Sequence, residues 1–188
     1  MYALYEEGGR FFAGRVLAQS DASLQVELES GKRVKVKAAA VMLRFEQPQP
    51  ADLMAAGESL AAEVDLDIAW EFAPAGDFGF AELARDYFSQ GATTEQQAAM
   101  LFALFGAPHY FRRLGRGNFR KAPAETVKAA LLGIERKKQQ AAQVDAWAAE
   151  LVGGVCPAPV REQLYKILFK PDKNAPETKA VVEAARRS

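Results

Sequence analysis

Apolar and polar residues alternate along the first 46 residues, which is the pattern of short, half-buried β-strands. Leu24, Val26 and Leu28 fall on one face of their segment, and the residues between them are polar or acidic. The segments with this character are residues 11–18, 23–29, 32–37 and 41–45. The outward residues are largely acidic in the second segment and basic in the third, so we expect ion pairs between them. The pattern predicts a meander of antiparallel strands.

A meander of this length is typical of a small SH3-like antiparallel β-barrel, and we predict such a barrel over residues 1–46. An oligonucleotide-binding barrel has a similar pattern and stays open as an alternative. Pro48 and Pro50 end the last strand, because proline lacks the N–H group that a sheet ladder needs. A domain boundary is therefore expected just before residue 51.

Helical spacing of apolar residues replaces the alternation after residue 51. A first helix is expected from an N-cap at Asp52 to about Phe72. A second helix covers residues 80–88, where aromatic residues and a leucine form one apolar stripe. Thr93 and Gln96 have the spacing of a capping box, which predicts a third helix over residues 94–105.

A basic hairpin follows these helices, and we use that name for residues 110–121. Two short runs, 110–114 and 118–122, flank the tripeptide Gly115-Arg116-Gly117. Glycine readily adopts the positive φ angles that a tight hairpin tip requires. Three helices followed by a hairpin is the order of a winged helix-turn-helix, a fold that presents cations to phosphates. We therefore predict a winged helix-turn-helix over residues 51–122.

The remaining residues, 123–188, predict a helical extension. Pro123 suits the first turn of a long helix over 124–151, and the middle of that helix is polar on every side. Further helices are expected after Pro157 and over residues 177–187. The complete prediction is an α+β fold with a small SH3-like antiparallel β-barrel, a winged helix-turn-helix and a helical C-terminal extension.

Charge is strongly segregated in this chain, although the formal net charge of its 188 residues is zero. Residues 51–95 contain ten acidic residues and one basic residue, whereas residues 96–123 contain five basic residues and no acidic one. All five of those cations lie in the basic hairpin. A surface with this asymmetry attracts a polyanion toward one face.

The basic hairpin combines phosphate-binding cations with aromatic rings. Stacking of an unpaired base on a ring contributes roughly 1–3 kcal/mol. Because side chains alternate along a strand, one face of the hairpin must pack on the helices, and some of these rings belong to the core. The residues expected to contact a nucleic-acid strand are Tyr110, Arg112, Arg113, Arg116, Asn118, Phe119, Arg120 and Lys121. The alternative interpretation is a solvated hairpin whose arginines serve only solubility.

Residue types needed for catalysis are scarce. The chain has no phosphate-binding loop and no nucleophile elbow, and Cys156 and His109 are its only cysteine and histidine. Asp65 and Asp67 are two residues apart, so on one helix they point about 160° away from each other and cannot clamp one metal ion. We predict no catalytic residue, no metal ligand and no cofactor in this chain.

Membrane insertion is not expected either. No apolar run approaches the roughly 20 residues that span a bilayer, and the N-terminus lacks the features of a signal peptide. The expected location is the cytoplasm, and no membrane partner is predicted.

Three segments of the chain resemble a known family. They are Phe78–Phe88, the basic hairpin from Tyr110-Phe111-Arg112-Arg113 to Phe119-Arg120, and Leu168-Phe169-Lys170-Pro171-Asp172-Lys173-Asn174. They are similar to the N-terminal region of bacterial ribonuclease II-type (RNB family) exoribonucleases that carry a winged helix-turn-helix. The resemblance covers most of the chain and is least distinctive over residues 1–46.

The resemblance implies an RNA-binding N-terminal portion of a longer enzyme that degrades RNA from its 3′ end. It implies magnesium held by an aspartate cluster in a separate catalytic domain, and neither Asp65 nor Asp67 matches that cluster. The expected partners are RNA and the catalytic domain of the same parent chain. The amphipathic helix that ends at Ser188 is consistent with a longer natural chain, and no hydrolysis is predicted for these residues alone.

Two other functions remain open from the sequence. The same helix and hairpin could enter the grooves of duplex DNA, as in a winged-helix regulator. Alternatively, the barrel or the acidic helix over residues 52–72 could serve as a protein-interaction module.

Overall fold

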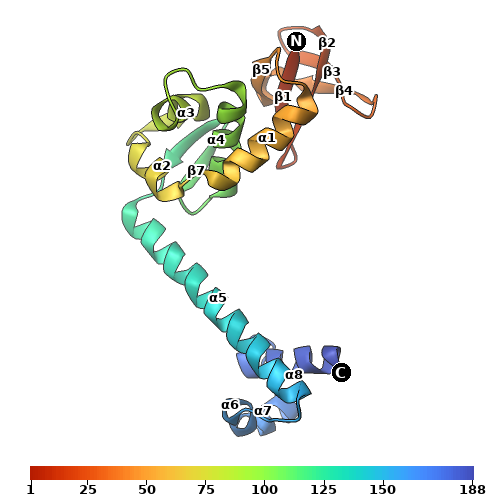
Figure 1. Cartoon of the computed structure of the whole chain (residues 1–188), viewed down its shortest axis with the longest axis vertical. Helices are drawn as coiled ribbons and strands as arrows, with labels where there is room; N and C mark the ends of the chain where they lie inside the picture. The colour runs from red at the N-terminus through yellow and green to blue at the C-terminus, as the bar shows by residue number, and fades with distance from the viewer. The chain divides into compact units, whose positions relative to one another are not determined.

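Five antiparallel strands open the chain in the computed structural model, which describes residues 1–188 (Figure 1). Their order in the sheet is β4-β3-β2-β1-β5. The strands are β1 (Tyr2–Glu7), β2 (Arg10–Gln19), β3 (Ser23–Glu27), β4 (Arg33–Lys37) and β5 (Val41–Phe45). The antiparallel meander is therefore confirmed, with a first strand before the earliest one that the pattern indicated.

The faces of the sheet follow the alternation. Leu24 and Val26 on β3 are fully buried, and Val36 on β4 is 5% exposed. On the outward face, the Glu27 carboxylate lies 2.6 Å from the Arg15 guanidinium and 3.5 Å from that of Arg33. The expected ion pairing across strands is present, and it includes β2 as well as β4.

The sheet is open, because β4 and β5 do not pair with each other. A 3₁₀ turn, η1 (Ala38–Ala40), connects these two edge strands and contacts β1 and β3. The hydrogen bonds between strands thus do not run all the way around, and the predicted closed barrel is not confirmed.

Four helices and three short strands follow the sheet. The helices are α1 (Pro50–Glu63), α2 (Leu66–Phe72), α3 (Phe80–Tyr87) and α4 (Thr94–Gly106). The strands are β6 (Asp77–Gly79), β7 (Phe111–Gly115) and β8 (Asn118–Lys121), and they form a second antiparallel sheet in the order β6-β8-β7. The capping box at α4 is confirmed, because Thr93 and Gln96 exchange both hydrogen bonds.

The predicted single helix over residues 52–72 is wrong, since the chain forms two helices there. The break falls at Val64 and Asp65, both of which have extended backbone angles. The Asp65 side chain accepts hydrogen bonds from the backbone N–H groups of Asp67 and Ile68. Asp65 is therefore the N-cap that starts α2. The first helix begins at Pro50, with Gln49 rather than Asp52 at the N-cap position and no capping hydrogen bond from its side chain.

One hydrophobic core joins the first sheet to the helices. Leu4 on β1 belongs to the same buried cluster as Leu53 on α1 and Leu101 on α4. The neighbouring β1 residues, Ala3 and Tyr5, point the other way into a smaller core inside the sheet. The first sheet and the helical part therefore form one compact body.

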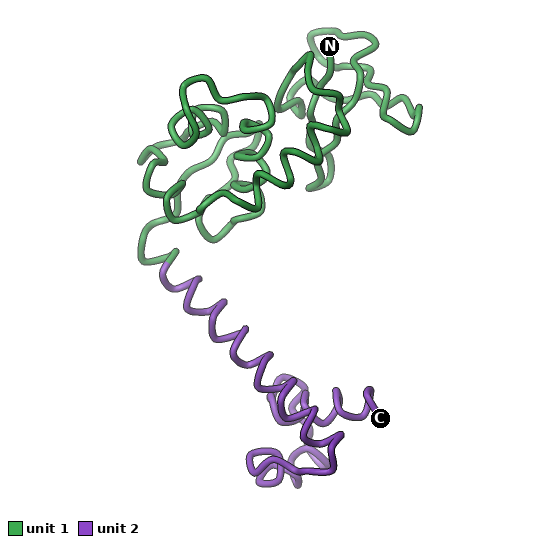
Figure 2. The backbone as a smooth tube through the Cα atoms, viewed as in Figure 1, with its two compact units in different colours: residues 1–127 green, residues 128–188 purple.

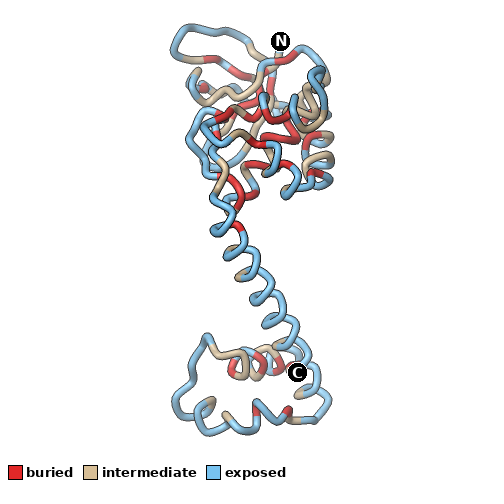
Figure 3. Tube along the Cα trace, turned by 90° about the vertical axis from the view of Figure 1, so that its left-hand side faces the viewer, coloured by how far each residue is buried: buried red, intermediate tan, exposed pale blue.

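The chain divides into two compact units, residues 1–127 and residues 128–188 (Figure 2). Helix α5 (Ala124–Val152) begins in unit 1 and continues in unit 2, where α6 (Ala158–Glu162), α7 (Leu164–Phe169) and α8 (Pro176–Arg187) follow. Buried residues are concentrated in unit 1 (Figure 3). None of the helices has the length and apolar character that a membrane crossing requires.

Candidate nucleic-acid interface

The tip of the basic hairpin has a fixed shape. Gly115, Arg116 and Gly117 have φ angles of 89°, 54° and 72°, so all three lie in the left-handed region, as predicted for the glycines. A Cβ atom at Gly117 would lie 2.8 Å from the Phe80 ring. The Asn118 side-chain amide donates hydrogen bonds to the carbonyl oxygens of Gly115 and Arg116, at 3.3 and 3.5 Å. The Asn118 side chain therefore stabilises the conformation of the tip, which includes Arg116.

One face of the hairpin packs on the core. Phe111 and Phe119 are buried, and their ring centroids lie 6.1 and 6.4 Å from that of Phe78 on β6. On the opposite face, Arg112 of β7 pairs in register with Arg120 of β8, and both are exposed. Phe119 thus has no open ring face on which a base could stack.

Tyr110 is also a core residue, with 4% of its surface exposed. Its hydroxyl donates a 2.6 Å hydrogen bond to Oδ1 of Asp67 on α2. Burial, and secondarily this hydrogen bond and the negative charge of Asp67, raise the pKa of Tyr110 to about 12. Tyr110 therefore anchors the base of the hairpin to α2 and, like Phe119, offers no exposed stacking surface.

Arg120 is the one hairpin cation that pairs with a carboxylate. Its Nε lies 2.5 Å from Oδ1 of Asp77 on the neighbouring strand β6. The hydrogen bond between them raises the pKa of Arg120 and lowers that of Asp77. Each side chain is about half exposed, at 51% and 53%. The charge of Arg120 is therefore largely balanced within the protein.

Two further cations are held against aromatic rings. The Arg113 guanidinium donates a 2.5 Å hydrogen bond to the carbonyl oxygen of Phe105, and its Cζ lies 3.4 Å from the centre of that ring. Lys121 donates a 3.3 Å hydrogen bond to the carbonyl oxygen of Trp70 and lies 4.8 Å from its ring centre. Neither contact involves a carboxylate, so both side chains keep their positive charge while their positions are fixed.

Arg112 and Arg116 are exposed and form no ion pair or side-chain hydrogen bond. With Arg113 and Lys121 they make four hairpin cations that no carboxylate of the chain neutralises. An open positive surface therefore remains on the hairpin, and its charge is concentrated on β7 and the tip.

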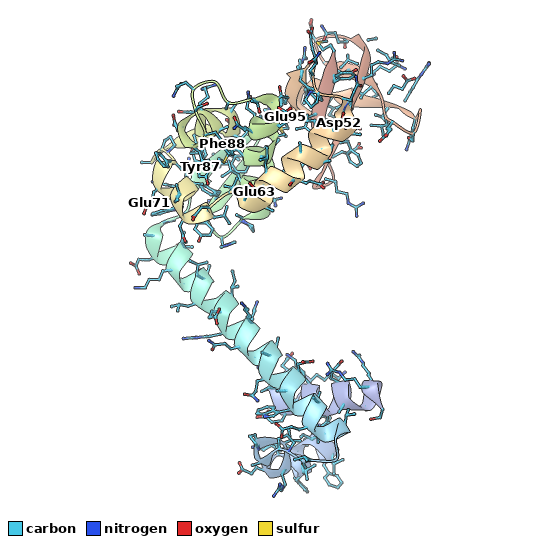
Figure 4. The ribbon with its side chains drawn as sticks, in the orientation of Figure 1. Asp52, Glu63, Glu71, Tyr87, Phe88 and Glu95 are labelled. Carbon is cyan, nitrogen blue, oxygen red and sulfur yellow. The ribbon has the colours of Figure 1, made fainter.

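Most acidic residues of the segment 51–95 lie on the helices of unit 1. Figure 4 labels Asp52 and Glu63 on α1, Glu71 on α2 and Glu95 on α4, and none of them forms an ion pair with a hairpin cation. Asp77 on β6 is the one residue of this segment that does, through Arg120, so most of the charge segregation of the sequence is retained in the fold.

No group of three or more histidine, cysteine, aspartate or glutamate side chains is arranged to hold a metal ion. His109 lies against Tyr110, with ring centroids 4.8 Å apart, and Cys156 is a free, half-buried thiol in unit 2.

A large cavity lies within unit 2, between α5 and α8, and has a volume of about 870 Å³. Lys137, Lys173 and Lys179 line it without an ion pair. Arg187 also lines it, but is bonded to Asp145 and to Glu183. The sequence did not reveal this cavity, because its lining residues belong to α5, to α8 and to the turn before α8, which are far apart in the chain.

Comparison of the chain with protein-family models, with curated proteins and with solved structures gave no match.

Proposed function

We propose that the chain binds single-stranded RNA through its basic hairpin, as the RNA-binding portion of a ribonuclease II-type 3′–5′ exoribonuclease. The observation that carries the proposal is the set of four hairpin cations, Arg112, Arg113, Arg116 and Lys121, that no carboxylate balances. Cations in this state are available to phosphates, and contacts to phosphates supply most of the affinity of sequence-independent binding.

The element order of unit 1 supports a winged helix-turn-helix. Helices α3 and α4 are followed by the hairpin β7–β8, and β6 joins that hairpin as a third strand. In such a domain the hairpin is the wing and α4 is the helix that enters a groove. The order β4-β3-β2-β1-β5, with η1 between the edge strands, likewise supports an SH3-like arrangement of the first 46 residues.

The composition of α4 favours single-stranded RNA over duplex DNA. A helix that reads the major groove presents arginine, lysine, asparagine or glutamine to base edges and phosphates. Helix α4 contains Glu95 and no lysine or arginine, and its two glutamines, Gln96 and Gln97, are hydrogen-bonded to the backbone at Thr93 and Ala92. The cations are instead on the hairpin, where they can follow a flexible strand.

The exoribonuclease assignment rests on the family resemblance. The resemblance implies a catalytic domain of the same parent protein, and that domain, not this chain, would hold magnesium. The proposed location is the cytoplasm, which was expected from the sequence independently of the resemblance. The chain's own part in the reaction is to bind RNA and deliver it to that domain.

Charge reversal of the two unpaired arginines tests the proposal. We expect the double variant Arg112→Glu, Arg116→Glu to bind a short oligouridine at least about tenfold more weakly than the wild type. The slope of log affinity against log salt should fall by about 1.4, because roughly 0.7 is lost per phosphate contact on a single strand. Fluorescence anisotropy at several salt concentrations measures both quantities.

The matched control is Lys35→Glu with Lys37→Glu, which makes the same change of charge on the exposed face of β4. Circular dichroism checks that both variants fold. An equal loss of affinity in the two variants would show that only net charge matters and would contradict the proposal. Tighter binding of the wild type to duplex DNA than to oligouridine at equal salt would instead favour a DNA-binding regulator.

A further inference from the structure

A small cavity lies where the basic hairpin meets the first sheet of unit 1. Its lining includes Glu6 at the end of β1, Met42 on β5, Phe105 on α4, and Arg113, Arg116 and Asn118 of the hairpin. The volume is about 290 Å³, which is just below the range of roughly 300–1,000 Å³ that is usual for small-molecule sites. The cavity is therefore suited to one flat ring system rather than to a folded segment of chain.

The wall of the cavity is apolar on one side and cationic on the other. Met42 and Phe105 supply the apolar surface, and the Arg113 guanidinium is fixed against the Phe105 ring by the hydrogen bond to the Phe105 carbonyl oxygen. Single-stranded RNA is bound by stacking its bases on aromatic rings and on guanidinium planes. The hairpin contains no exposed aromatic ring, and the Phe105 ring is in contact with the Arg113 guanidinium and with Phe11, so the stacking surface of this cavity is the exposed side of that guanidinium.

The Glu6 side chain determines which chemical group the cavity can bind. Its carboxylate accepts a 2.6 Å hydrogen bond from the Gly9 N–H group and forms no ion pair. A carboxylate in the wall repels a phosphate and attracts a hydrogen-bond donor. The Asn118 NH₂ group is already bonded to the hairpin tip, so Glu6 is the charged acceptor of this site. A carboxylate acceptor favours a base with an exocyclic amino group over uracil, whose only hydrogen-bond donor is the ring N3–H.

We infer that this cavity binds one unpaired nucleobase with an exocyclic amino group, while Arg113 and Arg116 hold the adjacent phosphates. The inference rests on the proposed RNA binding and adds a base preference to it. The ligand class is a cytosine, adenine or guanine within a single strand of RNA.

The experiment compares an oligouridine with the same strand carrying one central cytidine or guanosine. We expect the full-length wild type to bind the substituted strands about fivefold or more tightly than the all-uridine strand, because one additional hydrogen bond to a charged group is gained. Glu6→Gln should remove this preference and leave the affinity for the all-uridine strand unchanged or slightly higher. The Gln side chain can still accept the Gly9 hydrogen bond, which preserves the turn.

Glu7→Gln is the matched control, because Glu7 is the exposed neighbour of Glu6 and does not line the cavity. It should keep the base preference. No preference in the wild type, or the same loss in both variants, would overturn the inference while leaving RNA binding intact. Failure of the wild type to bind any of these strands would overturn the proposed function itself.

Discussion

Asp67 lies at the protein surface and accepts a hydrogen bond from a tyrosine that is almost completely buried. That tyrosine, Tyr110, stands at the start of the basic hairpin, next to the buried Phe111. The pair links α2 to the residue that precedes β7, and the hydrogen bond from Lys121 to the Trp70 carbonyl oxygen links α2 to the other strand of the hairpin. Asp67, for which the sequence indicated no role, thus has a structural one.

The titration of Tyr110 is expected to make the stability of unit 1 depend on alkaline pH. The pKa of Tyr110 is about 12 in the folded protein, against about 10 for an unfolded chain. Between these values the unfolded state has lost the proton that the native state keeps, so the free energy of unfolding falls as pH rises. Below a pH of about 10 the contribution of this group is constant.

Urea unfolding of the wild type and of Tyr110→Phe, compared from neutral pH to about pH 11, measures this effect. At neutral pH the variant should be about 1 kcal/mol less stable, because it loses a hydrogen bond to a charged acceptor that water can replace. The difference should shrink as pH rises, since the phenylalanine has no proton to lose. A difference that stays constant with pH would contradict the assignment.

At the scale of single residues, the sequence shows which hairpin residues are charged but not which side chains they contact. Arg112 and Arg113 are adjacent, and alternation shows only that they lie on opposite faces of β7. Both faces carry a cation and an aromatic ring, so the pattern could not tell which face is buried. Tyr110 contacts Asp67 and Phe119 contacts Phe78, and both of these partners come from distant parts of the sequence.

Among the elements, sequence motifs of a few residues that fix the backbone conformation predicted the structure correctly. The glycines at the hairpin tip and the capping box at Thr93 are confirmed because each depends on residues only a few positions apart. The break between α1 and α2 was missed, although Asp65 precedes a short apolar run as an N-cap does. An N-cap within a stretch that is helical on both sides competes with continuation of the helix, and sequence alone does not decide between them.

The crossing of α1 and α4 depends on a glycine. A Cβ atom at Gly57 would lie 2.8 Å from the Phe102 ring and 3.2 Å from Cβ of Ala98. Gly133 is a helical glycine with no atom within 4 Å of such a Cβ. Alanine is favoured over glycine in both helices by up to about 1 kcal/mol, but only Gly57 is restricted by a neighbour.

We therefore expect Gly57→Ala to lower the free energy of unfolding of unit 1 by about 1 kcal/mol, because overpacking outweighs the gain in helix propensity. Gly133→Ala should raise the stability of unit 2 by about 0.5–1 kcal/mol. Trp70 lies in unit 1 and Trp147 in unit 2, so urea unfolding followed by tryptophan fluorescence reports on each unit when the other tryptophan is replaced by phenylalanine. Stabilisation by Gly57→Ala would show that the two helices can separate without cost.

For the whole chain, the division at residue 127 places every hairpin cation in unit 1. The expected boundary near residue 51 separates two sequence patterns but not two cores, because Leu4 and Phe45 share a buried cluster with Leu53. A sequence pattern shows which face of a strand is apolar, but not which element covers it. The start of the long helix, in contrast, was predicted correctly at residue 124.

Separation of the two units provides a test at this scale. The core that supports the hairpin closes within residues 1–127, and Val127 is its last buried member. A fragment of residues 1–130 should therefore fold alone and bind oligouridine within about threefold of the full-length affinity, since contacts to phosphates on the hairpin set that affinity. Residues 131–188 contain the cationic cavity between α5 and α8 and serve as the comparison. If that second fragment carried the RNA binding and the first did not, lysines of unit 2 rather than arginines of the hairpin would be the groups that hold the strand.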